Sequence, residues 1–535
     1  MSRRFSDLDQ RRRELLLGGG AARIEKQHRQ GKLTARERLA LLLDPDSFVE
    51  FGLWAQEDSG GAEPLAAEGV VTGKGWVDGR AVYAFSQDFT VAGGSVGKLH
   101  AAKICECLRG ALRTGLPVVG FNDSGGARIQ EGVEALSGYG QIFYTNTLLS
   151  GVVPQISVIA GPCAGGAAYS PALTDFIVMV EESAKMFIAG PDVIRAATGE
   201  VISDEALGGA RVHAEVSGNI HFSAPDERSA VQVVKSLLSY LPANNLESPP
   251  DVAFEAPLVD DDGMDEIVPE DPRKAYDVHD VIHRLVDAGS FLEVQQAFGR
   301  SVVVGFARLG GMVVGVVANQ PMHLAGSLDM DASDKAARFV RTCNVFNIPL
   351  VTLVDVPGFL PGVAQEHGGI IRHGAKMLFA YSAATVPKMT VILRKAYGGA
   401  YLAMCSKDLG ADSVLAWPTA EIAVMGPEGA ARILSRRELE AATDREALLA
   451  EKVAEYRRLH ANPYRAAAAL YVDDVIRPSW TRRLLIERAE GRTRRRDDVA
   501  LGAAAVGDHG IRANQRRNAD KQRRHLGDRR RDQHQ

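Results

Sequence analysis

The sequence predicts an α/β protein built from two tandem copies of one domain. A shift of 232 residues carries Gly73 onto Gly305 and Gly126 onto Gly358 with no gap between them. Each half alternates strand-like and helical patterns, and 54 glycines are too many for an all-helical bundle. The further matched pairs are Gly79/Gly311, Gly94/Gly326, Ser95/Ser327, Lys103/Lys335, Pro117/Pro349 and Asp123/Asp355, and one inserted residue brings Gly165–Ala167 onto Gly398–Ala400.

The chain opens on a segment with helical periodicity. Residues 8–43 predict helix interrupted at Gly18–Gly20, since glycine destabilises a helix interior. Thr34 is expected to cap the last of these helices, with Glu37 at the capping-box position. Residues 68–86 then predict two strands around a tight turn at Asp78–Gly79.

A stretch rich in proline and acidic residues divides the alternating pattern. We expect an N-terminal domain over 1–241, a linker over 242–272, and a C-terminal domain over 273–490. The remaining tail, 491–535, carries 13 Lys and Arg against 6 Asp and Glu and has little apolar content, so it is predicted to be disordered.

Each copy repeats one arrangement of strands and glycines. An apolar strand ends in Asp and a glycine loop, and a second strand runs into Gly-Gly-Ala and a helix. Backbone N–H groups at a helix start are unpaired and can hold a negative oxygen without a charged side chain. The sequence therefore predicts a pair of oxyanion sites. The strands are Val118–Phe121 and Gln155–Ala160 in the first copy, and Leu350–Val354 and Lys388–Leu393 in the second.

Side-chain chemistry offers weaker candidates. Ser95 lies in a GxSxG pattern typical of a nucleophile elbow, but a plain glycine turn is the favoured interpretation, because the second copy lacks the flanking glycines. Glu131 or Glu134 could serve as a general base, although surface charge is the commoner use. No phosphate-loop motif occurs.

Metal binding is not predicted. His279 and His283 stand at i,i+4, which a solvated helix explains, and His367 and His373 are not at helical spacing. The five cysteines form no CxxC pair, which argues against a zinc ribbon and against disulfides, and so favours a reducing cytoplasm.

Charge and hydropathy exclude further classes. The formal net charge is −5, and without the basic tail the body is more acidic still, so nucleic-acid binding is not expected. No apolar run approaches the ~18 residues that span a bilayer. The charged N-terminus has no apolar signal core, so we expect neither export nor membrane insertion.

Several segments resemble one enzyme family. GFNDSGGARIQEG (120–132), AGPCAGGAAYSPALTDFIVMV (160–180) and RKAYGGAYLAMCSKDLGAD (394–412) resemble the carboxyltransferase β subunit of biotin-dependent acyl-CoA carboxylases, of the propionyl-CoA carboxylase β-chain type. The resemblance runs in order from about residue 8 to 487. It implies tandem crotonase-like (ClpP/crotonase) domains, in agreement with the repeat.

The resemblance also implies partners and a reaction. The family transfers a carboxyl group from carboxybiotin, held on a carrier domain of a separate biotin carboxylase α subunit, to an acyl-CoA thioester. No metal is implied in this subunit. The β subunits form a hexamer, a trimer of dimers, with each active site between the N-domain of one subunit and the C-domain of its partner. In the implied mechanism the biotin anion removes the substrate's α-proton, so no protein base is needed.

Site residues follow from the same resemblance. Gly165 and Gly166 are implied to hold the thioester oxygen, and Gly399 and Ala400, beside Gly398, the ureido oxygen of biotin. The implied CoA loop is Gly125, Gly126, Ala127 and Arg128, although Arg128 could also be a plain surface charge. The implied wall on the biotin side is Phe89, Thr90, Val91, Gly93, Gly94 and Ser95.

Leu402 departs from the pattern. Propionyl-CoA carboxylases often place Asp at this position of the acyl pocket, so acetyl-CoA or longer acyl groups stay open. Leucine here is similar to transcarboxylases and to methylmalonyl-CoA decarboxylase α-type subunits, which form the alternative function. A crotonase-type hydratase or hydrolase and an inactive scaffold are the remaining alternatives.

Overall fold

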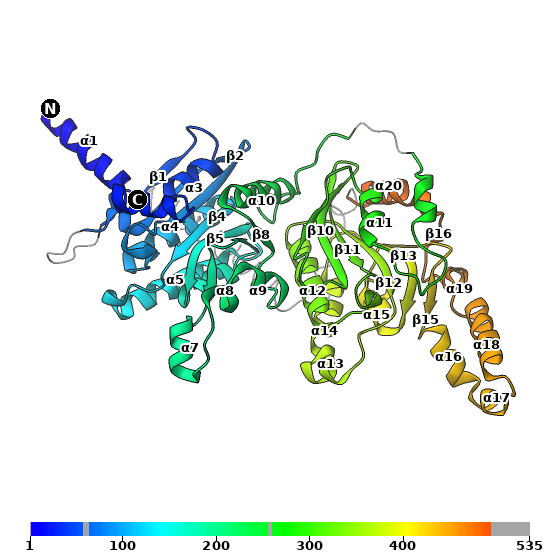
Figure 1. Cartoon of the computed structure of the whole chain (residues 1–535). Coiled ribbons are helices and arrows are strands. Elements are labelled where there is room, and N and C mark those ends of the chain that lie inside the picture. Colours follow the sequence, from blue (N-terminus) through cyan, green and yellow to red (C-terminus); the bar gives the residue numbers. More distant parts are fainter. Residues whose placement is uncertain (1, 57–63, 255–258, 494–535) are drawn as a thin grey trace, which may run out of the picture.

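The chain forms two lobes, each a β-sheet covered by helices (Figure 1). The computed structural model describes residues 2–56, 64–254 and 259–493. The predicted tail falls almost wholly outside these ranges. Within them, no helix is long and apolar enough to cross a membrane.

Three helices begin the chain, as the sequence predicts, although the first starts at Ser2 and not at residue 8. They are α1 (Ser2–Leu16), α2 (Ala21–Arg29) and α3 (Ala35–Leu42). Gly18 and Gly20 have φ of +54° and +89°, so the interruption falls at residues suited to left-handed backbone. Thr34 and Glu37 form the complete capping box at the start of α3.

The N-terminal lobe has an eight-stranded sheet in the order β1-β2-β3-β4-β5-β6-β8, with β7 paired to β5. The β2–β3 hairpin is antiparallel about Asp78–Gly79, as predicted, and β3 to β6 run parallel. The strands are β1 (Val49–Phe51), β2 (Val70–Val77), β3 (Arg80–Gln87), β4 (Val118–Ser124), β5 (Gln155–Ala164), β6 (Phe176–Val180), β7 (Lys185–Phe187) and β8 (Phe222–Ala224). The helices are α4 (Lys98–Thr114), α5 (Val133–Leu149), α6 (Gly166–Ala172), α7 (Pro191–Thr198), α8 (Asp204–Gly208), α9 (Ala210–Glu215) and α10 (Glu227–Tyr240).

The C-terminal lobe repeats this sheet in the order β9-β10-β11-β12-β13-β14-β16, with β15 paired to β13. Its strands are β9 (Leu292–Val294), β10 (Val302–Leu309), β11 (Met312–Asn319), β12 (Leu350–Val356), β13 (Lys388–Tyr397), β14 (Ser413–Ala416), β15 (Glu421–Ala423) and β16 (Asp474–Val475). Its helices are α11 (Val278–Leu285), α12 (Met330–Val345), α13 (Val363–Gly368), α14 (Ile370–Ala383), α15 (Gly398–Ala403), α16 (Pro427–Leu434), α17 (Arg436–Ala441), α18 (Arg445–Leu459), α19 (Pro463–Ala468) and α20 (Thr481–Thr493). Short 3₁₀ turns lie at Ala66–Gly69, Ala92–Gly94, Ile129–Glu131, Asp262–Glu266, Leu324–Gly326, Lys407–Leu409 and Pro478–Trp480.

The duplication is confirmed strand by strand. β2, β3 and β4 map onto β10, β11 and β12 with the predicted shift of 232 residues. Even an isolated bridge repeats, since Val96 pairs with Ala127 and Leu328 with Phe359. The two sheets pack together through aromatic rings, with the Phe176 and Phe306 centroids 5.8 Å apart.

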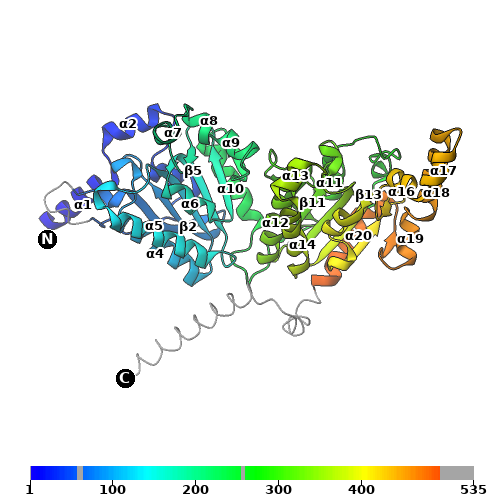
Figure 2. The same ribbon diagram turned by 90° about the horizontal axis from the view of Figure 1, so that it is seen from below.

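The predicted linker packs against the second lobe over part of its length. Met264 and Val268 belong to a buried cluster with residues of the C-terminal sheet, and Val252 N donates to Gly311 O (3.0 Å). In Figure 1 the chain leaves the first lobe after α10 and enters the second lobe before α11, and Figure 2 shows the two lobes from below. The domain boundaries given above stay predictions.

His279, which follows the linker, predicts a measurable pH dependence. Hydrogen bonding to Glu293 (3.0 Å), with Asp277 Oδ1 2.6 Å away, raises the pKa of His279 from 6.5 to about 9. Because the folded pKa is the higher one, the stabilisation is complete below about pH 6.5 and is lost as pH rises through 9. We expect His279→Gln to lower the free energy of unfolding by about 1–2 kcal/mol at pH 6, a value reduced for partial exposure, and by little above pH 9. Urea titrations at both pH values check this, and an equal difference at both would contradict it.

Candidate functional site

The two predicted glycine turns occupy matching places, where β5 enters α6 and β13 enters α15. Gly165 and Gly398 have φ of +60° and +57°, which favours glycine at each first position. A Cβ on Gly398 would lie 3.0 Å from Val424 O. Since Gly165 matches Gly398, Gly166 matches Gly399 and Ala167 matches Ala400.

Not every backbone N–H group of the two turns can donate to a substrate oxygen. Gly165 N donates to Phe187 O (3.0 Å), so this residue shapes the turn while its own N–H is occupied. The following amides, beginning at Gly166 and Gly399, belong to the first helical turn, where N–H groups have no partner within the helix. Gly399 is exposed, and a Cβ added there meets nothing within 4 Å.

Two predicted loops of the N-terminal lobe lie against each other beside the Gly165 turn. Gly125 N donates to Gly93 O (3.0 Å), and Val96 N donates to Gly126 O (2.9 Å). A Cβ on Gly126 would lie 3.0 Å from Ala164 O, at the end of β5. The fold thus brings together the residues implied for CoA and for the biotin-side wall.

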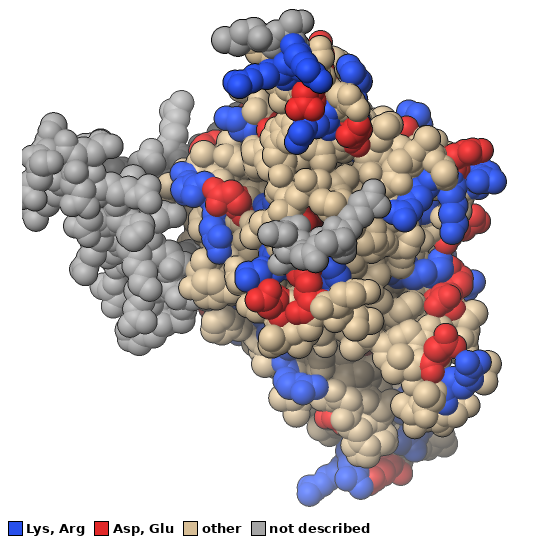
Figure 3. All heavy atoms as spheres, turned by 90° about the vertical axis from the view of Figure 1, so that its left-hand side faces the viewer, with Lys and Arg blue, Asp and Glu red and all other residues tan. Residues whose placement is uncertain are grey.

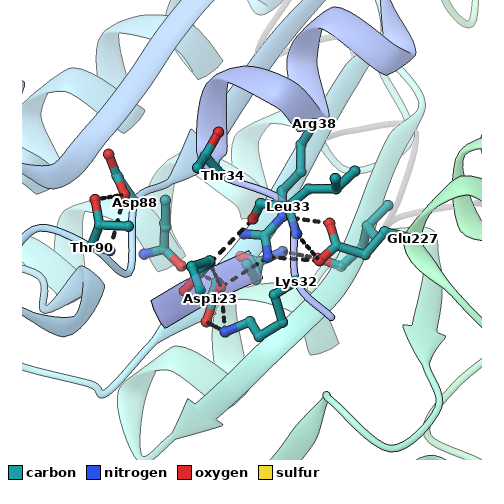
Figure 4. Close-up of polar contacts among 12 residues, drawn as sticks. Lys32, Leu33, Thr34, Arg38, Asp88, Thr90, Asp123 and Glu227 are labelled. Carbon is teal, nitrogen blue, oxygen red and sulfur yellow. Dashed lines mark hydrogen bonds and ion pairs between the residues drawn. The ribbon is translucent and has the colours of Figure 1, made fainter. Parts of the chain in front are cut away.

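The first part of that wall contacts the N-terminal helices. Gly19 N donates to the Thr90 hydroxyl (3.0 Å), and Arg23 Nη1 donates to Thr90 O (3.2 Å). Val91 is buried, and Lys32 Nζ lies 4.5 Å from the Phe89 ring centroid. Figure 4 shows Thr90 beside Asp88, whose carboxylate accepts from the Thr90 hydroxyl (2.6 Å). Thr90 and Val91 therefore have structural contacts that explain them.

Arg128 is buried rather than the plain surface charge that the sequence also allowed. Its Nη1 lies 2.8 Å from Glu68 and 2.6 Å from Glu131, and its Nη2 donates to Ser95 O (3.1 Å). Most N–H donors of the guanidinium group therefore have partners inside the protein. They link the Ser95 turn to the loop after β4.

The side-chain candidates for catalysis have structural partners. Glu131 also accepts from Lys98 N (2.6 Å) at the start of α4, and Glu134 pairs with Lys98 Nζ (3.1 Å). The Ser95 hydroxyl accepts from Arg128 Nε (3.5 Å), and the residue lies in a loop, three residues before α4. These contacts favour the plain-turn interpretation of Ser95 and a structural use of the two carboxylates.

One histidine of each pair contacts a carboxylate, since His279 lies 3.0 Å from Glu293. His373 Nδ1 lies 2.8 Å from Asp334, and the rings of His279 and His283 lie side by side on α11. Across the described ranges, no group of three or more His, Cys, Asp or Glu could hold a metal ion.

A buried ion-pair network supports the N-terminal site (Figure 4). Asp123, at the carboxyl end of β4, lies 2.8 Å from Lys32 Nζ and 3.0 Å from Arg38 Nη2. Arg38 Nε in turn lies 2.7 Å from Glu227 on α10. The second lobe has a matching buried ion pair, since Asp355 lies 2.9 Å from Arg394. The sequence repeat matches the two aspartates but gives no sign of their partners.

Both lobes carry exposed apolar side chains. On the N-terminal lobe they include Ile129, Val133, Leu136, Tyr144 and Tyr169, and on the C-terminal lobe Val363, Ile371, Phe379, Leu402 and Val424. Large exposed apolar patches mark interaction sites. Elsewhere, on the face drawn in Figure 3, acidic and basic side chains are intermixed.

Comparison with known proteins decides the family. The carboxyl transferase domain model matches residues 26–499. The chain belongs to the carboxyl transferase family. It is 55% identical to the methylmalonyl-CoA decarboxylase subunit alpha of Propionigenium modestum, over 91% of this chain and 95% of that one. It is 56% identical to the methylmalonyl-CoA carboxyltransferase 12S subunit of Propionibacterium freudenreichii subsp. shermanii (92% and 94%), and 56% identical to the propionyl-CoA carboxylase beta chain of Saccharopolyspora erythraea (90% and 91%).

A solved structure gives the same result. The crystal structure of the transcarboxylase 12S hexamer, with methylmalonyl-coenzyme A and methylmalonic acid bound, is 54% identical with a TM-score of 0.89, over 95% of this chain and 98% of that one. The resemblance, the crotonase-like fold and the acyl-CoA carboxyltransferase activity predicted from sequence are therefore confirmed. In this carboxyl transferase the paired glycine turns are the leading candidates for the catalytic residues.

Proposed function

We propose that this carboxyl transferase moves a carboxyl group from carboxybiotin to the α-carbon of propionyl-CoA, giving methylmalonyl-CoA, as the β subunit of an acyl-CoA carboxylase. The observation that carries the proposal is the pair of glycine turns at matched register, one in each lobe. The names of the relatives, which include propionyl-CoA carboxylase beta chains, support the substrate class.

The Gly165 and Gly398 turns are assigned to oxygens of two different substrates, the acyl-CoA and biotin. The Gly166 amide holds the thioester oxygen of the acyl-CoA as negative charge develops on it, and Gly165 supplies the left-handed turn. Gly399 and Ala400 hold the ureido oxygen of biotin, which fits the open space above Gly399. When bound, carboxybiotin supplies the carboxyl group. One oxyanion donor contributes about 3–4 kcal/mol in other enzymes, so both turns matter to the rate.

Substrate loops complete the proposal. Gly125, Gly126 and Ala127 receive the CoA moiety, with Arg128 fixing their position, and Gly93, Gly94 and Ser95 line the biotin side. No side chain of this chain is assigned as a base, because Glu131 and Glu134 are held by Lys98 and Arg128.

Assembly and partners belong to the same proposal. A biotin carboxylase α subunit with its carrier domain delivers carboxybiotin, and six copies of this chain form a trimer of dimers. Exposed apolar residues on both lobes support a dimer that brings the Gly165 turn of one subunit to the Gly398 turn of another. The buried free cysteines fit a cytoplasmic location.

Carboxyl exchange by the isolated protein tests the proposal. Methylmalonyl-CoA and free biotin are supplied, and propionyl-CoA formation is followed, with acetyl-CoA, propionyl-CoA and butyryl-CoA compared as acceptors of the reverse transfer. Biotin-dependent exchange supports the proposal. No exchange, also after addition of a biotinylated carrier domain, overturns it, and release of free CoA without biotin favours a crotonase-type hydrolase.

A transcarboxylase or decarboxylase subunit is the second candidate. The relatives named for these activities, together with Leu402, favour it. The partner encoded beside this chain separates the cases, since a biotin carboxylase indicates the first function and a sodium-pumping membrane subunit indicates a decarboxylase.

Leu402 is expected to limit the acyl group. It lies on α15, three residues after Gly399, and is partly exposed. Leu402→Ala removes apolar volume, so we expect the kcat/KM ratio of butyryl-CoA to propionyl-CoA to rise about tenfold. Initial rates with both substrates measure the ratio, and an unchanged ratio would exclude Leu402 from the acyl pocket.

A further inference from the structure

Side-chain contacts connect the outer helices of the C-terminal lobe to the Gly398 turn. Arg457, on α18, donates from Nε to Glu421 Oε1 (2.9 Å) and from Nη2 to Glu428 Oε1 (2.9 Å). The other oxygen of Glu421 accepts a hydrogen bond from the hydroxyl of Tyr397. Tyr397 immediately precedes Gly398, so Arg457 reaches the turn through two side chains.

The residues between β15 and α16 support this turn from one side. Tyr397 pairs with Ala423 in the sheet, and a Cβ on Gly426 would lie 3.4 Å from the Tyr397 ring. Val424 O faces Gly398, as described above. Burial raises the pKa of Tyr397, which keeps its hydroxyl a donor to Glu421. A displacement of the Glu421 side chain would therefore also displace the Tyr397 ring, which lies next to the turn.

The first lobe lacks these contacts. Lys185 occupies the place of Glu421, because Lys185 pairs with Pro162 on β5 as Glu421 pairs with Lys395 on β13. Ala164 occupies the place of Tyr397 and has no hydroxyl. The contacts are thus a feature of one turn and not of the repeated fold, which points to a role specific to that turn.

We propose that Arg457, acting through Glu421 and Tyr397, is a positioning residue for the backbone turn that binds biotin. The proposal rests on the assignment of Gly399 and Ala400 to biotin made above. The helices α16 to α18 form the outer edge of the lobe (Figure 1, lower right). Arg457 holds α18 to Glu428 on α16 as well as to Glu421, so the position of these outer helices is coupled to the donor site.

Transfer from methylmalonyl-CoA to free biotin tests the coupling, with each substrate varied in turn. Arg457→Met keeps the aliphatic stem and removes both ion pairs. We expect the KM for biotin to rise about tenfold, as befits loss of a charge-assisted bond, while the KM for methylmalonyl-CoA changes by less than about twofold. Tyr397→Phe removes a single hydroxyl and must raise the biotin KM in the same direction. Arg457→Lys keeps the charge without the fork and is expected to restore part of the loss.

Lys452→Met is the matched control. Lys452 lies on the same helix and pairs with Glu438 (2.9 Å), so its loss removes an ion pair of α18 that does not lead to the turn. Its two KM values must stay at those of the parent chain. Equal changes in both KM values of Arg457→Met, a change in kcat alone, or no change overturns the proposal. Failure of the parent chain to transfer to biotin would instead count against the proposed function.

Discussion

Asp123→Asn is expected to lower the free energy of unfolding by about 3–5 kcal/mol, the cost of leaving buried charges unpaired. The Asp123 side chain is fully buried, Lys32 and Arg38 are almost as deeply buried, and both cations lie within 3.0 Å of its carboxylate. The amide offers one acceptor and no charge, so buried Lys32 loses its counterion and buried Arg38 keeps only Glu227. A urea titration of the full chain measures the effect, and an unchanged midpoint would contradict it.

Two further variants serve as comparisons for the stability of Asp123→Asn. Glu215→Gln breaks the exposed pair with Arg211 on α9 and is expected to change stability by less than about 1 kcal/mol. Asp355→Asn removes the matching carboxylate, which lies near Arg394 and Lys395, and should destabilise about as much as Asp123→Asn. If only Asp123→Asn has a large effect on stability, the two aspartates are not equivalent, contrary to what the repeat predicts.

Local signals in the sequence predicted much of the fold. The glycine interruption after α1, the capping box of Thr34 and Glu37, and the Asp78–Gly79 hairpin each depend on residues a few positions apart, and all three are present. The repeat added long-range information, because identical spacing in two halves implies the same strand pairing in both.

The contacts between distant residues were not predictable in the same way. Lys32 and Arg38 are 91 and 85 residues from Asp123, and nothing in their local pattern distinguishes them from surface charges. Arg128 was open to interpretation as a surface charge for the same reason. One signal was present in the sequence. Asp123 and Asp355 are charged residues at matched positions of the two copies, and each follows an apolar strand.

The candidate site was predicted at the level of backbone. The repeated Gly-Gly-Ala pattern made Gly165 and Gly398 candidates, and both have the positive φ that favours glycine. Which amide stays available depends on a neighbouring strand, and the bond from Gly165 N to Phe187 O emerged only in three dimensions. The same holds for Tyr397 and Glu421, whose contact has no counterpart in the other lobe.

Gly399→Ala is expected to separate catalysis from stability most sharply. The backbone of Gly399 suits any residue, and an added Cβ has open space, so the variant should fold with an unchanged urea midpoint. That space is where the proposal places the biotin ureido oxygen, so the methyl group is expected to lower the rate of carboxyl transfer to biotin about 100-fold, comparable to losing one oxyanion donor. Gly429→Ala is the matched control, because Gly429 is exposed on α16 and the added methyl meets only Met425 Sδ at 3.7 Å. A stable Gly399→Ala chain with full transfer activity would remove the second turn from the reaction, whereas loss of activity in both variants would point to the surrounding helices instead.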